Sequence, residues 1–249
     1  MKTKNLFVFS LLMVIMLAMT ACQAAGPKKV KVVMDATWPP FEMLDEKTKE
    51  PIGFDVDLMK AIAKNQGFEV EFVNVPFDSA LTGLAQCQYD AAISAVTITD
   101  ERKKTMLFTE PYFAAGQIVT VSKNNQDIKS KDDLSGKKIG AMIGTTGAIE
   151  AEKIKGAEYK AYDTIDLAFL DVMNGQLDAV IADNPLAVGF VGKNPDKLKM
   201  VGEVFTDENY GIAVCNKQPD LLEKMNKGLA AVKSEGVIEQ LVQKWLVQQ

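Results

Sequence analysis

Alternating hydrophobic and polar positions divide residues 29–96 into strands and helices. Residues 29–35 are rich in β-branched side chains and precede a Trp-Pro-Pro break, a pattern typical of a strand. Apolar residues recur at helical spacing over residues 55–65 and again over 79–86. Residues 68–72 and 90–96 are predicted to be two further strands. The resulting order, β-α-β-α-β, favours a parallel sheet with helices on its faces.

The same rhythm returns after a break near residues 111–113. The pattern predicts a strand over 138–143, a helix over 147–155, a strand over 157–161, a helix over 165–174 and a strand over 178–183. The sequences LAQCQYDAAISA and VMNGQLDAVIAD, which begin at residues 84 and 172, share a helix, turn, Asp-Ala, strand pattern. They occupy the same point of both cycles, which favours two halves of related architecture.

After the second cycle, a strand over 210–214 and helices over 220–233 and 237–247 are predicted. We therefore expect the chain to return to the first half and finish there. This divides the chain into lobe 1 (residues 30–114 and 212–249) and lobe 2 (residues 115–211), with hinge strands near 115–121 and 208–214. Hinged lobes bind ligands between them, and parallel sheets place their binding loops at the carboxyl ends of strands.

The first 21 residues have the pattern of a bacterial export signal. Lys2 and Lys4 form a basic head, an apolar run follows, and small residues precede Cys22. The run is too short for a typical membrane-spanning helix. The similarity to lipoprotein signals implies acylation of Cys22 and a stalk over residues 22–29. Met19 stands where such signals more often carry leucine, so cleavage by an ordinary signal peptidase is the alternative.

Composition narrows the function further. The sequence contains no histidine, which removes Ser-His-Asp and Cys-His catalysis and imidazole metal sites. The net charge is −5 and there is no polybasic block, so the sequence gives no sign of a nucleic-acid-binding surface. Beyond the signal the only thiols are Cys87 and Cys215, too few for a zinc cage. A disulfide between them and two buried free thiols are both open.

Two segments offer groups that bind an anion. Thr97 lies at the end of a predicted strand, and the planar guanidinium of Arg102 suits a carboxylate. The alternative is that Thr99 caps a helix and leaves Arg102 in solvent. The turn at residues 144–147 (GTTG) opens a helix, so its backbone N–H groups also suit an anion. It lacks the lysine and spacing of a nucleotide P-loop, and an ordinary capped turn is its alternative.

Other strand ends offer groups that bind a cation. Asp183 ends its strand, and its carboxylate suits an ammonium group, with capping of the next helix as the alternative or additional role. Asp35, Trp38 and Phe77 also follow strands. An acid with two aromatic faces suits a flat or cationic side chain, although aromatic residues more often belong to the core. Groups that bind an anion and groups that bind a cation together suit a zwitterion.

Four ordered motifs resemble a known family. Residues 53–63 (GFDVDLMKAIA) are similar to the first-helix signature of the periplasmic polar amino-acid-binding proteins of ABC importers. Residues 97–102 (TITDER), 144–146 (GTT) and 178–183 match further segments over essentially the whole mature chain. The resemblance implies an α/β fold of the type II periplasmic-binding-protein class. Each lobe would be a mainly parallel sheet flanked by helices, and a two-strand hinge would join them.

The resemblance also implies a role for each candidate residue. Arg102 and Thr97 would bind the α-carboxylate of the ligand, with the backbone at Thr145 and Thr146. Asp183 and the backbone near Ser94 and Ala95 would bind its ammonium group. The side-chain pocket would be formed by Trp38 and Phe77, with Asp35 at its polar end. Departures from some relatives at Met142 and Ala182 leave glutamine and arginine both open as ligands.

The implied role is the extracytoplasmic binding component of an ABC importer for a free polar amino acid. We expect a monomer without a cofactor or catalytic activity, held at the cell membrane through lipid on Cys22 and facing the periplasm or cell exterior. Its partners would be the importer's membrane subunits. Two alternatives use the same fold: an enzyme like the cyclohexadienyl or arogenate dehydratases, and a subunit that senses amino acids for a membrane receptor.

Overall fold

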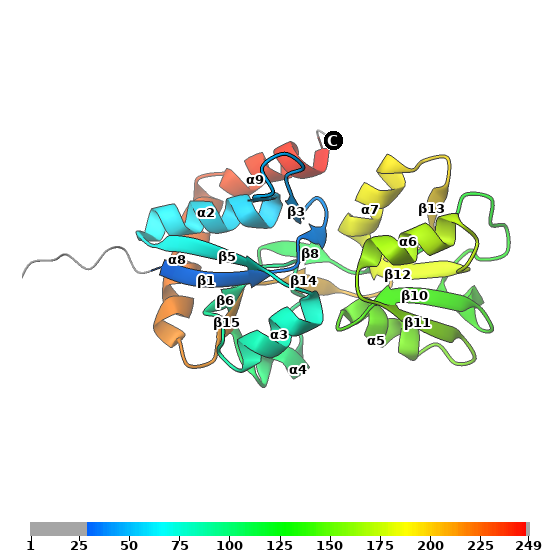
Figure 1. Ribbon diagram of the computed structural model, residues 1–249, viewed down its shortest axis with the longest axis horizontal. Coiled ribbons are helices and arrows are strands. Elements are labelled where there is room, and N and C mark those ends of the chain that lie inside the picture. Colours follow the sequence, from blue (N-terminus) through cyan, green and yellow to red (C-terminus); the bar gives the residue numbers. More distant parts are fainter. Residues whose placement is uncertain (1–28, 248–249) are drawn as a thin grey trace, which may run out of the picture.

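The computed structural model describes residues 29–247, which form two five-stranded sheets side by side (Figure 1). The predicted export signal, Cys22 and all but the last residue of the predicted stalk lie outside the described residues. Between residues 29 and 247, no helix combines the length and the apolar character that crossing a membrane requires.

The first sheet forms the centre of lobe 1. Its strands, in spatial order, are β5 (Glu69–Asn74), β1 (Lys29–Met34), β6 (Ala91–Ala92), β15 (Ala213–Cys215) and β7 (Met106–Phe108). All run in the same direction except β15, which is antiparallel to both neighbours. On one face, α2 packs against two C-terminal helices, and shorter helices lie on the other face (Figure 1). The helices are α2 (Phe54–Gln66), α3 (Phe77–Ala85), α4 (Asp100–Lys103), α8 (Pro219–Ser234), α9 (Val237–Val242) and the π-helix η2 (Gln243–Val247).

The second sheet forms the centre of lobe 2 and repeats this arrangement. Its strands, in spatial order, are β11 (Glu158–Tyr162), β10 (Lys138–Met142), β12 (Ala179–Asp183), β9 (Gln117–Ser122) and β13 (Leu198–Val201). Again only the fourth strand, β9, runs against the others. The helices are the 3₁₀-helix η1 (Lys131–Leu134), α5 (Thr146–Glu152), α6 (Ile165–Met173) and α7 (Asn184–Lys193). The predicted fold class, mainly parallel sheets flanked by helices, is confirmed.

The internal sequence echo has a structural cause. In lobe 1 the carboxylate of Asp90 accepts a hydrogen bond from the backbone N–H of Lys31 at 2.8 Å, just before β6. In lobe 2 the carboxylate of Asp178 accepts one from the backbone N–H of Lys138 at 2.7 Å, just before β12. In each lobe this aspartate ties the start of the third strand to its parallel neighbour. The repeated Asp-Ala step therefore performs one structural task twice.

A two-stranded sheet lies between the lobes where the chain crosses from one to the other (Figure 1). β8 (Phe113–Ala115) leads into lobe 2, and β14 (Glu208–Tyr210) leads back, and the two are antiparallel. After each crossing the chain continues into the one reversed strand of a five-stranded sheet, β9 in lobe 2 and β15 in lobe 1. The boundaries at residues 114–115 and 211–212, and movement about this sheet, stay predictions.

Several elements differ from those predicted. Residues on both sides of Pro39 and Pro40 form a small sheet of β2 (Thr37–Trp38), β3 (Glu42–Leu44) and β4 (Pro51–Ile52). β6 is only two residues long, and Ala95, within the segment predicted as a strand, adopts a φ of 45°, which lies outside the extended region. The strand predicted over 210–214 is split into β14 and β15. The short strands β7 and β13 were not predicted, because three or four apolar residues give too little periodicity.

Cys87 and Cys215 form a disulfide, so the bridged alternative holds. Cys87 follows α3, and Cys215 ends β15, the strand that returns from lobe 2. The bridge spans 128 residues and fastens the returning chain to the turn before β6.

Removing this bridge should lower the free energy of unfolding, because closing so long a loop restricts the unfolded chain. We expect the double variant Cys87→Ser/Cys215→Ser to lose about 2–5 kcal/mol in urea unfolding. Wild-type protein in reductant should then have the same free energy of unfolding as the variant. Equal stability of oxidised wild type and variant would contradict the expectation.

Candidate functional site

Nine of the ten predicted ligand residues line one cavity between the lobes. Lobe 1 contributes Trp38, Phe77, Ser94, Ala95, Thr97 and Arg102, and lobe 2 contributes Thr145, Thr146 and Asp183. The cavity has a volume of about 10 Å³, roughly the room that one water molecule needs. The cavity therefore has no room for a larger molecule in this structure.

Arg102 joins the two lobes across this cavity. Its guanidinium donates to the carbonyl of Thr97 at 2.7 Å and to the carbonyl of Gly144, on lobe 2, at 3.0 Å. The guanidinium carbon lies 5.5 Å from the centroid of the Phe77 ring. Burial lowers the pKa of Arg102, and the carboxylates of Asp183 and Glu208 oppose that change. The group keeps its charge, because the usual pKa of arginine lies far above neutrality.

The capping alternatives for the anion-binding segments are also realised. Thr99 accepts a hydrogen bond from the backbone N–H of Arg102 at 3.1 Å, so it caps α4 while the Arg102 side chain faces the cavity. Thr145 accepts from Ala148 N–H at 3.2 Å and caps α5. The N–H of Thr145 donates to the carbonyl of Met142 at 3.3 Å, so this predicted carboxylate donor already has a partner.

Asp183 does not use its side chain to cap α7. One oxygen accepts from the Gln117 side-chain amide at 2.7 Å, and the other accepts from the Tyr210 hydroxyl at 2.5 Å. Burial raises the pKa of Asp183 to about 6, and the charge of Glu208 adds to the rise. Hydrogen bonds from Tyr210 and Gln117 and the charge of Arg102 act in the opposite direction.

Glu208 was missed by the sequence reasoning, yet it connects the predicted residues of both lobes. Its Oε2 accepts from the Thr97 hydroxyl at 2.9 Å, the Thr146 hydroxyl at 2.7 Å and the Gln117 amide at 3.3 Å. Its Oε1 accepts from the Thr206 hydroxyl at 2.8 Å. Both Gln117 and Glu208 are buried and begin strands at the crossings between lobes. Each is a polar residue at the start of a strand, but the local sequence pattern does not show which distant residues it contacts.

Asp35 is the predicted ligand residue that does not line the cavity. One of its oxygens accepts from the Thr37 hydroxyl at 2.8 Å, and the other accepts from the backbone N–H of Phe77 at 2.9 Å. It therefore holds the start of α3. Its contact with a ligand side chain stays a prediction. Burial raises the pKa of Asp35. Trp38 does reach the cavity, and its indole N–H has no hydrogen-bond partner among residues 29–247.

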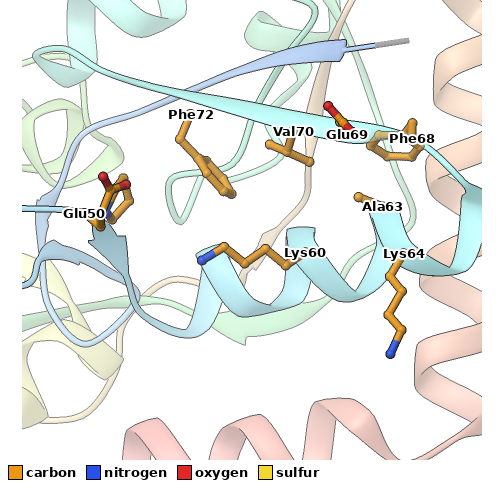
Figure 2. Close-up of a pocket in the computed structure, with 9 residues that line it drawn as sticks. Glu50, Lys60, Ala63, Lys64, Phe68, Glu69, Val70 and Phe72 are labelled. Atoms are coloured by element: carbon orange, nitrogen blue, oxygen red, sulfur yellow. The ribbon is translucent and has the colours of Figure 1, made fainter. Parts of the chain in front are cut away.

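A larger hollow, of about 510 Å³, lies elsewhere, between α2 and β5 (Figure 2). Figure 2 shows Val70 and Phe72 pointing from β5 toward α2, with Lys60 extended beneath Phe72. The Lys60 ammonium is 5.9 Å from the centre of the Phe72 ring. The hollow is an open surface along the outermost strand of lobe 1 and contains none of the predicted ligand residues. Converging polar groups, and not volume, therefore identify the candidate site.

Comparisons with known proteins show which family the chain resembles. Residues 30–248 match the model of the bacterial extracellular solute-binding proteins, family 3. The chain is 35% identical to the ABC transporter arginine-binding protein 1 of Escherichia coli K12, over 96% of this chain and 99% of that protein. Two structures of an ancestral arginine-binding protein share 42% identity with it over 87% of this chain and 97% of theirs. The TM-score is 0.83 for the arginine-bound structure and 0.80 for the glutamine-bound one.

Proposed function

Because this chain belongs to family 3 of the bacterial extracellular solute-binding proteins, we propose that it captures a free amino acid for an ABC importer, with arginine as the preferred ligand. The resemblance stated from the sequence is thereby confirmed. The relatives named above are binding proteins, which supports a binding role over the dehydratase-like alternative.

One observation carries the proposal: a guanidinium and a carboxylate from opposite lobes line the same cavity. Arg102 comes from lobe 1 and Asp183 from lobe 2, and both are held in place by hydrogen bonds. A free amino acid carries a carboxylate and an ammonium group, which match these two groups in charge. Arg102 has five N–H donors, of which two contact protein carbonyls, so donors remain for a ligand carboxylate.

The charges around the cavity favour a basic ligand over glutamine. Within and directly around it, the carboxyl groups of Asp183, Glu208 and Asp35 outnumber the one cation, Arg102. An additional positive charge on the ligand would offset this excess. Trp38 also lines the cavity, and aromatic faces attract cationic groups. The glutamine-bound relative makes glutamine the main competing ligand.

Ligand binding would favour closure of the two lobes. The ligand contacts Arg102 on one lobe and Asp183 on the other, so both contacts are made only in the closed form. A ligand shifts an equilibrium toward the form that it binds better. The importer's membrane subunits would recognise the closed form. Because one chain supplies both sides of the cavity, we propose that a monomer is sufficient.

Arg102→Ala and Asp183→Asn should each weaken arginine binding severely, because each leaves one charged end of the ligand buried without its partner. We expect a loss of about 2–5 kcal/mol in titration calorimetry at pH 7.5. Wild type should bind arginine more tightly than glutamine. The exposed neighbours provide matched controls, Lys103→Ala and Asp163→Asn, which should bind like wild type. Unchanged affinity in either cavity variant would contradict the proposed binding of the ligand by Arg102 and Asp183.

Arginine binding should also weaken in acid, because a protonated Asp183 no longer attracts an ammonium group. The pKa of Asp183 is raised to about 6, so binding should be strong at pH 7.5 and fall progressively below about pH 6. The expected loss approaches roughly tenfold per pH unit. Asp183→Asn should remove most of this dependence. An affinity that stays constant from pH 7.5 to pH 5 would contradict it.

We further propose that residues 1–21 direct export and that lipid on Cys22 holds the protein at the outer face of the cell membrane. The basic head, the apolar run and the small residues before Cys22 support this. Full-length wild type expressed in bacteria should incorporate labelled palmitate and fractionate with membranes. Cys22→Ser should do neither. Equal labelling of both proteins would exclude Cys22 as the anchor.

A further inference from the structure

Two carboxyl side chains lie behind the cavity with no solvent exposure. Glu42 begins β3, and Asp55 lies in the first turn of α2. Gly53 allows the two elements to approach, since its φ is 134° and a Cβ there would lie 2.1 Å from the carbonyl oxygen of Phe41. The backbone N–H of Asp55 donates to that same carbonyl at 2.9 Å. The strand is thereby fastened to the start of the helix, and the two acids are brought together.

Each acid uses one oxygen to hold the turn that lines the cavity. Glu42 Oε1 accepts from the Ser94 hydroxyl at 2.7 Å. Asp55 Oδ2 accepts from the backbone N–H of Ala95 at 2.7 Å and from the Tyr112 hydroxyl at 2.8 Å. Ala95 has a φ of 45°, an unusual conformation for a residue with a side chain, so the turn needs such support.

The second oxygen of each acid is buried without a donor. In the described part of the chain, Glu42 Oε2 and Asp55 Oδ1 have no hydrogen-bond partner. Two ionised carboxylates placed so closely in an apolar interior would repel and remain unsatisfied. One proton between the acids satisfies both oxygens and removes one charge.

The pKa values agree with this geometry. Burial raises the pKa of Glu42 well above its usual range, and the charge and hydrogen bond of Asp55 raise it further. Burial raises the pKa of Asp55 to about 7, while hydrogen bonds from Ala95, Tyr112 and Glu42 lower it. The bond between the acids thus acts in opposite directions on the two groups, which places the proton on Glu42.

We propose that Glu42 and Asp55 share one proton and act as a positioning pair, whose single negative charge on Asp55 holds the Ser94–Ala95 turn toward the ammonium group of the ligand. Neither acid touches the ligand, since neither lines the cavity. The ligand part of this inference rests on the proposed function, whereas the shared proton does not.

The shared proton predicts a stability that depends on pH in the absence of ligand. Because the pKa of Glu42 is raised in the folded state, its contribution to stability is fully present below the usual pKa of glutamate and is lost as the pH rises from there to the folded-state pKa. Asp35, Tyr112 and Tyr210 are the other ionisable groups that act on the pair. These groups are unchanged in a Glu42 variant. The difference in pH-dependent stability between wild type and that variant therefore reports on the pair alone.

The experiment uses Glu42→Gln, which reproduces the shape and the donor of the protonated acid but cannot ionise. We expect the Tm of ligand-free wild type to fall between pH 5 and pH 9 by about 3 °C more than that of Glu42→Gln. Glu46→Gln, at an exposed position just beyond the same strand, should follow wild type. An equal alkaline loss in wild type and Glu42→Gln would overturn the shared proton.

The positioning role is tested by calorimetry with arginine at pH 7. Glu42→Gln should bind within about twofold of wild type, whereas Asp55→Asn should bind at least about fivefold more weakly, because it moves the charge away from the N–H of Ala95. A merely structural role predicts that the two isosteric amides behave alike, and that result would overturn the positioning pair. If wild type bound no amino acid, the proposed function would fail, and the stability comparison would still decide the shared proton.

Discussion

The carboxylate of Glu208 is the acceptor on which the closed arrangement of the two lobes depends. It receives the hydroxyl of Thr97 from lobe 1 and the hydroxyl of Thr146 from lobe 2 on a single oxygen. A buried carboxylate is costly unless donors surround it. Its burial is therefore compatible only with a geometry in which both lobes bring their donors to the same place. Because Thr97 and Thr146 also line the cavity, the same hydrogen bonds set the position of its walls.

The polar cleft is built on an aromatic base, and Tyr210 connects the two. Its ring packs against Phe41 and Phe113, with centroid separations of 5.4 and 6.0 Å. Its hydroxyl reaches Asp183 of lobe 2. One side chain therefore belongs both to the apolar core at the crossing and to the polar site. Such a link fixes the position of a charged group more rigidly than surface hydrogen bonds would, because the ring is completely buried.

The sequence predicts the fold well where periodicity is long, as in α2 and β10. It also predicts cavity residues at or beyond the carboxyl ends of strands, such as Asp183 and Thr97. Gln117 and Glu208 were missed because their partners lie far away in sequence, where no local pattern records the contact. The hydrogen bonds that Asp35 accepts from Thr37 and Phe77 cannot be read from the spacing of residues in the sequence. The disulfide was left open for the same reason, since sequence gives no distance between Cys87 and Cys215.

The path of the chain also bears on the order in which the lobes form. The sheet of lobe 2 is made by one uninterrupted stretch, whereas the sheet of lobe 1 has a gap between β6 and β7 that only β15 fills. During synthesis from the N-terminus, all strands of lobe 2 emerge before that gap is closed. Lobe 1 must wait for nearly the whole polypeptide, even though its first strand is made earliest. Such a delay would leave lobe 1 without its complete sheet until synthesis is nearly finished.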